Sequence, residues 1–451
     1  MTDFHTPGLQ APGRRGLLLG GAALLAVPAT VRAQPAAGGA VIDITRARTE
    51  PVPIAVPAMA GGPRGADIAR VIENNLRNSG LFRPVSNAAF IQSAEAAAAT
   101  PRFADWRVIG ANALVTGRVE DGGGQTRVEF RLWDVLPEQQ LQGTRFTTNA
   151  ANWRQVAHQI SDAIYERLLG EKGYFDTRIA YVAESGPRDR RVRRLAVMDQ
   201  DGENNRILTD GSFQALSPRF HPNGRQIVFM SYFQNQPRVY LTDITAPGRQ
   251  EVLGNFPGMT LSPRFSPDGR AVVLSYARGA DANIYAVDVG SRSQRQLTSG
   301  SGLDVSPSYS PDGGQIVFNS DRGGDQQLYV MGSGGGGARR ISFGRGRYAT
   351  PVWSPRGDLI AFTRISGGQF GIGVMRPDGS GERILSEGWQ MEGPTFAPNG
   401  RVLAFYRESR AGAGGAGYSA RLSQIDIAGF NERQIGTPTD ATDPSWSPLL
   451  A

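Results

Sequence analysis

A short phrase recurs six times in the second half of the chain at nearly constant spacing, and it constrains the fold more than any other feature. The copies are SPRFHPNG from Ser217, SPRFSPDG from Ser262, SPSYSPDG from Ser306, TPVWSPRG from Thr350, GPTFAPNG from Gly393 and DPSWSP from Asp443. The steps between them are 45, 44, 44, 43 and 50 residues. A period held over this length indicates a repeat architecture, in which each unit is a supersecondary element that packs against its neighbours.

Every repeat has the same internal order. The turn is followed by an alternating apolar segment such as RQIVFMSYF, a polar loop, a second such segment such as RVYLTDI, and a short third segment such as RQLTS. About 44 residues holding four strands are typical of a β-propeller blade. In the turn, Pro presets φ, Asp or Asn caps the backbone and Gly takes a positive φ, so the motif is explained by structure rather than by catalysis or metal binding.

The number of strands predicts how the ring closes. The last copy, DPSWSP, has almost no chain after it, whereas three strands precede the first copy: RIAYVAE from Arg178, RRLAVMD from Arg193 and RILTD from Arg206. We therefore expect the C-terminal strand to complete the first blade. The sequence predicts a mainly β fold with a six-bladed β-propeller over residues 173–451.

Residues 49–172 have a different pattern. PVPIAVPAM, ALVTGRVE, TRVEFRLWDV and LQGTRFTTN read as strands. GADIARVIENNLRNSG reads as an amphipathic helix that stops at Gly80, and NWRQVAHQISDAIYERLLG reads as a longer one. A small α/β domain is predicted ahead of the propeller.

The first 48 residues indicate export. Arg14 and Arg15 precede GLLLGGAALLAV, which is too short to span a bilayer, and the small residues around Ala33 suit a signal peptidase. We expect a signal peptide over residues 1–33, cleaved near Ala33, followed by a flexible arm over residues 34–48. The paired arginines also fit a twin-arginine signal, and the choice between that route and general export stays open. No later segment is apolar enough to form a transmembrane helix.

Composition and motifs argue against several functions. The absence of cysteine excludes disulfides, thiolate metal sites and cysteine nucleophiles. The net charge is +7, but the arginines are scattered and the densest run, RDRRVRR, lies between two strands, so no nucleic-acid partner is expected. His5 falls in the signal, His158 on a helix and His221 in a repeat turn, and no GxSxG motif occurs. We therefore expect no enzyme.

Two alternatives remain open at this stage, a propeller hydrolase and a periplasmic protein that binds a small ligand or a glycan. Trp353, Trp389 and Trp446 offer stacking faces for a sugar, although the first and last occupy the inner-strand position where core residues are expected. Asp304 and Asp443 could contribute to a cation site at the channel mouth, but a solvated rim is the favoured interpretation. No metal and no cofactor are predicted.

With these parts in place, the sequence resembles the TolB family, the periplasmic propeller proteins of the Tol-Pal system. The resemblance rests on VIDI at Val41, NLRNSGLF at Asn75, EKGYFDTRIAYV at Glu171, the repeated phrase and the final DPSWSP. It implies a non-catalytic scaffold that links the inner and outer membranes for envelope integrity and for outer-membrane invagination in cell division. A closed ring with no free edge separately favours a monomer. The implied partners are Pal, the peptidoglycan-associated lipoprotein, at the propeller mouth, TolA at the N-terminal arm, and possible further outer-membrane proteins.

The resemblance also suggests contact residues. The candidate Pal contacts immediately precede each motif and are Gln214, Leu216, Met259, Thr260, Asp304, Val305, Tyr348, Met391, Glu392 and Thr442. The candidate TolA contacts are Val41, Ile42, Asp43, Ile44 and Thr45. We expect the arm to alternate between the protein and TolA, with Pal binding shifting the balance, and such coupling is reciprocal.

Overall fold

The structure is a computed structural model that describes residues 50–187, 190–233, 236–410 and 417–450. The predicted signal peptide and the arm, including Val41 to Thr45, lie outside these residues. Within them, no helix is long and apolar enough to cross a membrane.

The first domain is built on a five-stranded sheet with the order β2-β1-β3-β4-β5. Its strands are β1 (Val52–Ala55), β2 (Phe82–Pro84), β3 (Ala113–Gly122), β4 (Gln125–Asp134) and β5 (Gln139–Asn149). β1 runs parallel to β2 and β3, and β4 runs antiparallel to both β3 and β5. This is the small α/β domain that the sequence predicted.

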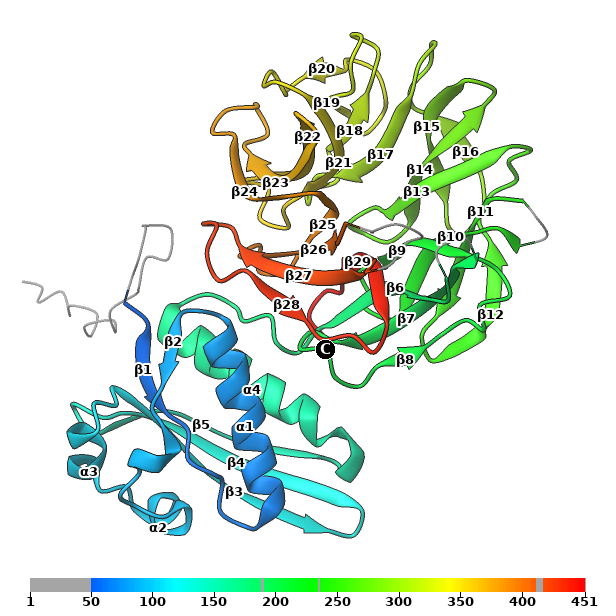
Figure 1. The fold of residues 1–451 in the computed structure, drawn as a ribbon. Coiled ribbons are helices and arrows are strands. Elements are labelled where there is room, and N and C mark those ends of the chain that lie inside the picture. The colour runs from blue at the N-terminus through cyan, green and yellow to red at the C-terminus, as the bar shows by residue number, and fades with distance from the viewer. Residues whose placement is uncertain (1–49, 188–189, 234–235, 411–416, 451) are drawn as a thin grey trace, which may run out of the picture. The chain divides into compact units, whose positions relative to one another are not determined.

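Helices cover both faces of this sheet. They are α1 (Pro63–Asn78), α2 (Ala94–Ala99), α3 (Phe103–Val108) and α4 (Trp153–Leu169), with short 3-10 turns at Asn87–Ala89 and Ala150–Asn152. The two long helices α1 and α4 lie side by side (Figure 1) and share one apolar core with the sheet. Ile68, Ile72 and Leu76 of α1 are fully buried in it, and Gly80 takes the left-handed φ of 72° that ends the helix.

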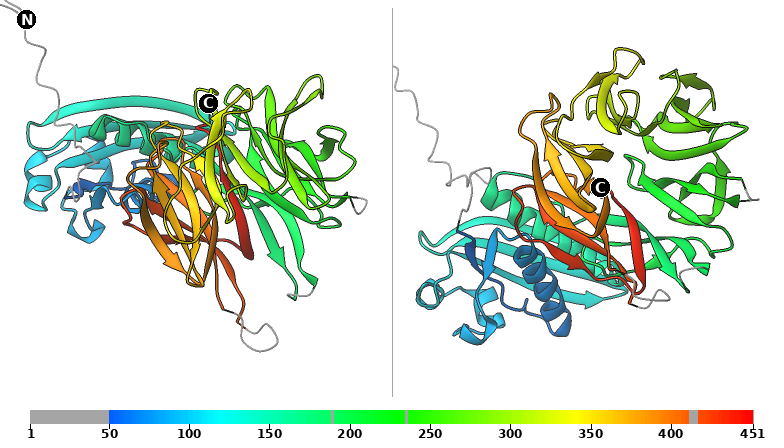
Figure 2. Two further views of the ribbon diagram at one scale, coloured as in Figure 1. Left: turned by 90° about the horizontal axis from the view of Figure 1, so that it is seen from above. Right: turned by 45° about the horizontal axis from the view of Figure 1, so that its top comes forward.

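Six four-stranded sheets follow and form the ring seen in Figure 2. Named from the inner strand outward, the first is β29 (Asp440–Trp446), β6 (Arg178–Ser185), β7 (Val192–Asp199) and β8 (Arg206–Ile207). The second is β9 (Ala215–Phe220), β10 (Gln226–Ser231), β11 (Arg238–Asp243) and β12 (Ala246–Val252), and the third is β13 (Met259–Phe265), β14 (Ala271–Arg278), β15 (Asp281–Asp288) and β16 (Gln294–Gln296).

The remaining three sheets repeat this order. They are β17 (Asp304–Tyr309), β18 (Gln315–Ser320), β19 (Gln327–Gly332) and β20 (Arg339–Arg340); β21 (Arg347–Trp353), β22 (Ile360–Ser366), β23 (Gln369–Met375) and β24 (Arg383–Gly388); and β25 (Gln390–Phe396), β26 (Val402–Glu408), β27 (Ala420–Asp426) and β28 (Arg433–Ile435). The predicted number of blades is confirmed.

The closure is also as predicted. β29 pairs antiparallel with β6, with Asp440 opposite Glu184 and Trp446 opposite Ile179. The first blade therefore combines the last strand of the chain with three strands that precede the first motif. Trp446 and Trp353 are only 6% and 7% exposed, so both are core residues, as their position in the motif suggested.

The recurrent motif makes the same local geometry in every blade. Its first residue takes a left-handed φ, between 46° at Thr350 and 67° at Gly393, and the pairing of each inner strand shifts register there. Such a β-bulge lets the following proline, which has no N–H to donate, sit inside a strand. The glycine that ends each complete turn has φ between 68° and 78°, as the turn chemistry required.

Candidate partner-binding face

Each inner strand begins on one face of the propeller and ends at the repeated turn on the other. We call the first the rim face and define it by the loops that lead into the inner strands. We call the second the turn face and define it by the Pro-x-Gly turns that follow them. Since the candidate contacts precede the motifs, they belong to the rim face.

The side chains just ahead of each motif alternate in exposure, as expected for a strand. The residue immediately before the motif is half-buried in five blades, the second before it is buried in all six, and the third before it is half-buried or exposed. Thr260, Asp304, Tyr348 and Met391 all occupy the buried second position, at 5% exposure or less. The pleat therefore turns these four side chains into the blades and away from solvent, and their role as Pal contacts stays a prediction.

Each of these four side chains already has an internal role. Asp304 accepts two hydrogen bonds of 2.8 Å from Arg322, and the hydroxyl of Tyr348 donates to Glu382 over 2.8 Å. The hydroxyl of Thr260 accepts from the backbone N–H of Val239 over 3.1 Å.

Met391 lies in the apolar core of its blade. Thr442 is also buried, at 6% exposure, and its hydroxyl donates to Glu184 over 3.1 Å. The five buried candidates therefore shape the rim without presenting their side chains to solvent.

The other five candidates are accessible. Met259 is exposed, whereas Leu216, Val305 and Glu392 are half-buried at the position immediately before their motifs. Gln214 is half-buried and donates from its amide to the backbone carbonyl of Arg191 over 2.8 Å.

Among the candidate rim residues, Glu392 has a pKa shifted into the neutral range. Burial raises its pKa to about 7, and the negative charges of Asp443 and Glu408 act in the same direction. The side chain therefore exchanges its proton near neutral pH, while most carboxylates remain charged there.

The rim face also carries exposed aromatic side chains that were not among the candidate Pal contacts. Phe213 and Phe233 form an edge-to-face pair with 4.5 Å between ring centroids. Phe343 is 72% exposed beside Arg340, and Trp389 is 45% exposed beneath the guanidinium of Arg410 at 4.4 Å. We call the set of Phe213, Phe233, Met259, Phe343 and Trp389 the aromatic rim.

A sequence signal for this set existed. Three of its members precede a motif by a few residues within loops of glycine and polar residues, as in DGSFQALSP, ISFGRGRYATP and EGWQMEGP. A bulky side chain in a loop between an outer strand and the next inner strand has little core to enter.

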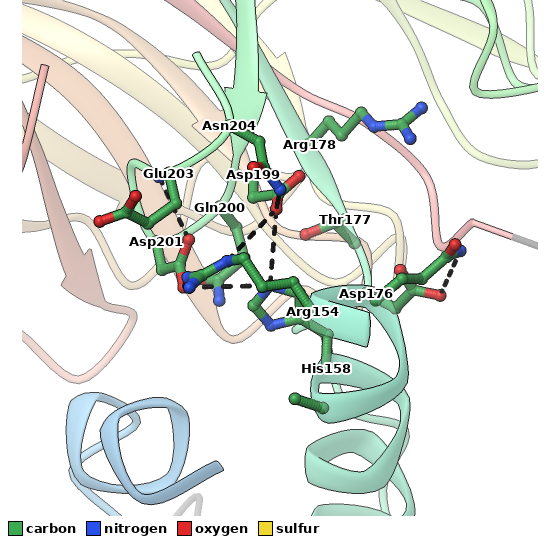
Figure 3. A network of polar contacts seen from close by, with 12 residues as sticks. Arg154, His158, Asp176, Thr177, Arg178, Asp199, Gln200, Asp201, Glu203 and Asn204 are labelled. Carbon is green, nitrogen blue, oxygen red and sulfur yellow. Dashed lines mark hydrogen bonds and ion pairs between the residues drawn. The ribbon is translucent and has the colours of Figure 1, made fainter. Parts of the chain in front are cut away.

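The turn face, in contrast, contains paired charges where the first domain contacts the propeller. Figure 3 shows Arg154 and His158 of α4 beside the residues that follow β7. Arg154 bonds to Asp201 and lies 3.8 Å from Asp199. Asn75 of α1 donates to His158 Nδ1 over 2.9 Å and accepts from Gln200 over 3.0 Å.

The group of His158, Asp199 and Asp201 has the residue types of a metal site, with the candidate ligand atoms within 4.8 Å of one another. The local bonding favours a different use. Because Nδ1 of His158 accepts from Asn75, neutral imidazole carries its proton on Nε2, the atom that faces the carboxylates. Arg154 already supplies a positive charge to both acids, so the group forms a junction between domains.

A second junction lies at the linker. Glu171 accepts from Arg401, with 2.7 Å between Nε and Oε2, and also pairs with Arg356 at 3.3 Å. Burial alone would raise the pKa of Glu171, but the hydrogen bonds and charges of the two arginines outweigh it and hold the pKa below its ordinary value. Both arginines belong to repeat turns.

His221 occupies one of these turns as well. Its Nε2 contacts the carbonyl of Gly269 at 3.2 Å and its Nδ1 accepts from the backbone N–H of Asn223 at 2.9 Å. Burial lowers its pKa. With both ring nitrogens bonded to backbone, this histidine stabilises the turn.

The fold and these two faces define a class, namely a two-domain protein with a small α/β domain and a closed six-bladed propeller. A model of the TolB amino-terminal domain matches residues 40–141, and a model of the TolB β-propeller domain matches residues 165–450. The chain belongs to the TolB family and is a component of the Tol-Pal system.

Individual relatives agree over nearly the full length. The chain is 54% identical over 430 residues to the Tol-Pal system protein TolB of Gluconobacter oxydans, covering 94% of this chain and 93% of that protein. It is 58% identical over 440 residues to the same protein of Paramagnetospirillum magneticum, covering 96% of each. The crystal structure of TolB from Acinetobacter baumannii is similar with a TM-score of 0.78 and 28% identity, over 89% of this chain and 97% of that one.

Proposed function

We propose that this protein is the periplasmic scaffold of its Tol-Pal system, binding the Pal lipoprotein on the rim face of the propeller and TolA through the N-terminal arm. By joining an outer-membrane lipoprotein to an inner-membrane protein, it would link the two membranes for envelope integrity and outer-membrane invagination during division. The proposal involves no catalysis.

The observation that carries the proposal is the aromatic rim. Five of the large apolar side chains exposed in the described part of the propeller lie on this one face, and two of them are accompanied by arginine. Aromatic residues, Met and Arg are enriched at protein interfaces, and hot spots are most often Trp, Tyr and Arg. A face built in this way supports docking of a folded protein better than binding of a small ligand.

The arm supplies the second half of the proposal. Residues 34–48 follow the predicted cleavage point near Ala33, and the segment from Val41 to Thr45 has the alternating apolar pattern of a strand that could add to a partner. Export by the twin-arginine or the general route would deliver the mature protein to the periplasm.

The decisive experiment measures binding of the soluble domain of Pal to residues 34–451 by titration calorimetry. The double variant Phe213→Ala/Phe233→Ala removes the edge-to-face pair on the rim face. We expect its affinity for Pal to fall about tenfold or more, because truncating central aromatic anchors costs over 1 kcal/mol each. The matched control is Phe430→Ala, since Phe430 is 49% exposed between β27 and β28, at the turn face.

Unchanged Pal affinity in the double variant, or an equal loss in Phe430→Ala, would contradict the assignment of the rim face. The arm is tested separately by deleting residues 34–48. This deletion should abolish TolA binding, and Pal binding should survive it.

A further inference from the structure

The third residue of each motif lies in the inner strand of its blade, and these six positions differ in chemistry. They are Arg219, Arg264, Ser308, Val352, Thr395 and Ser445. Two adjacent blades thus contribute arginine where three others contribute a hydroxyl.

The hydroxyls at this level join neighbouring blades. Ser308 accepts from the backbone N–H of Trp353, Thr395 from that of Trp446, and Ser445 from that of Phe220, each over 3.2 Å. In each case the hydroxyl oxygen serves as acceptor, so its own proton remains available to a group inside the channel.

The two arginines have no such partner. Arg219 donates to the carbonyl of the adjacent Pro218 over 2.6 Å, and no ion pair joins either guanidinium to a carboxylate among the residues described by the structure. Burial lowers the pKa of both, Asp443 offsets this for Arg219, and the charge of Arg219 lowers the pKa of Arg264 further. Two neighbouring, half-buried positive charges favour a counter-charge beside them.

A cavity of about 170 Å³ opens between them. It is lined by both arginines together with Ser266, Thr395 and Ser445, and no carboxylate is among its described lining residues. Since a water molecule occupies about 30 Å³ in the liquid, the space holds about five waters or one small polyatomic ion. His221 and Pro267 of the repeat turns also line it, so it belongs to the turn-face end of the channel.

We propose that this cavity is a binding site for a small oxyanion, held between Arg219 and Arg264 and completed by the hydroxyls of Thr395 and Ser445. Guanidinium groups match the oxygen spacing of phosphate and carboxylate groups and bind them through paired hydrogen bonds. The anion could be free phosphate or a carboxylate, and both present the same oxygen chemistry to the site.

The test follows thermal unfolding of residues 34–451 against added sodium phosphate, and separately against sodium acetate, at fixed pH and ionic strength. A ligand that binds only the folded state raises the Tm with its concentration. We expect a saturating rise with at least one of the two anions. In Arg264→Gln the apparent dissociation constant should be about tenfold weaker or worse, as expected when a charged hydrogen-bond donor is lost.

The unfolding temperature of Arg264→Gln without anion is a second measurement, and a substitution that merely disrupts the fold would lower it. Without added anion, Arg264→Gln should unfold at a higher temperature than the wild type, because the like-charge repulsion with Arg219 is gone. Arg249→Gln is the matched control, since Arg249 is exposed on β12 and carries the same charge. It should respond to anions as the wild type does.

Equal responses of the wild type and Arg264→Gln to both anions would overturn the proposal, because salt then acts on the whole protein. A response to phosphate alone or to acetate alone that depends on Arg264 supports the site and identifies its anion. If Arg264→Gln does not fold, Arg219→Gln serves in the same comparison. Arg264→Gln should bind Pal as tightly as the wild type does. Failure of the anion proposal can therefore be told apart from failure of the proposed Pal-binding face.

Discussion

The rim face and the turn face of the propeller are made by the same repeat, yet they present different chemistry. On the turn face, Arg401 and Arg356 pair with Glu171, and Asp201 pairs with Arg154, so these charged side chains meet partners within the chain. On the rim face, aromatic side chains such as Phe343 remain in water. The repeat therefore sets the backbone of both faces, whereas the loops outside the repeat determine what each face can bind.

The first prediction concerns the contribution of the turn-face end to the free energy of unfolding. Trp446 packs edge to face on Tyr174 with 5.8 Å between centroids, and its indole N–H donates to Thr177 over 2.8 Å. Trp446→Ala should lower the free energy of unfolding by about 3–5 kcal/mol, because it leaves a large cavity. Urea unfolding measures this, with the exposed Trp389→Ala on the rim face as control. If Trp446→Ala loses no more unfolding free energy than Trp389→Ala does, the predicted difference in packing between the two faces is wrong.

The next effect concerns Glu392 on the rim face. Because its folded pKa of about 7 lies above the ordinary value of 4.5, the folded state retains a proton that the unfolded state releases. The stability that the protonated Glu392 carboxyl gives the folded state is therefore fully present below pH 4.5, and it is lost as the pH rises through 7 and the carboxyl ionises. Glu392→Gln should be more stable than the wild type at pH 8 by about 1–3 kcal/mol and nearly equal to it at pH 4.5.

Unfolding free energies measured across this pH range check the prediction for Glu392. Parallel curves for the wild type and Glu392→Gln would mean that the carboxyl is solvated at the channel mouth. The rim face would then lack its buried titrating group.

The smallest expected effect on stability belongs to Phe343. At 72% exposure its ring buries little area, so Phe343→Ala should change the free energy of unfolding by no more than about 0.5 kcal/mol. Thermal unfolding checks this. A loss above 1 kcal/mol would show that the aromatic rim serves the fold, and the two faces would then be alike.

The sequence was sufficient for the architecture because the signals for it are local and repeated. The alternation of apolar residues, the turn glycines and the placement of DPSWSP together specified six blades and the closing strand. The same six copies predicted where each inner strand begins, and hence which face carries the candidate residues.

Individual contacts were harder to predict. Tyr348 and Met391 were selected by their nearness to a motif, but the left-handed residue and bulge at each motif set the phase of the pleat and turned them inward. The approach of Arg219 and Arg264 from two blades to one cavity also depends on the radius of the ring, which no local pattern encodes. The exact domain boundaries and the roles of Val41 to Thr45 stay predictions.

The closing strand also has a consequence for the folding of the chain. Thr442 of β29 bonds to Glu184 of β6 across 258 positions of the chain. Until β29 arrives, β6 has an open edge, and an unpaired strand edge invites pairing with other chains. A chain that emerges from its N-terminus therefore keeps this edge open for almost the entire length of the propeller. The pairing that closes the ring is therefore highly non-local, and pairings of this kind form slowly and leave strand edges open to aggregation while they are unmade.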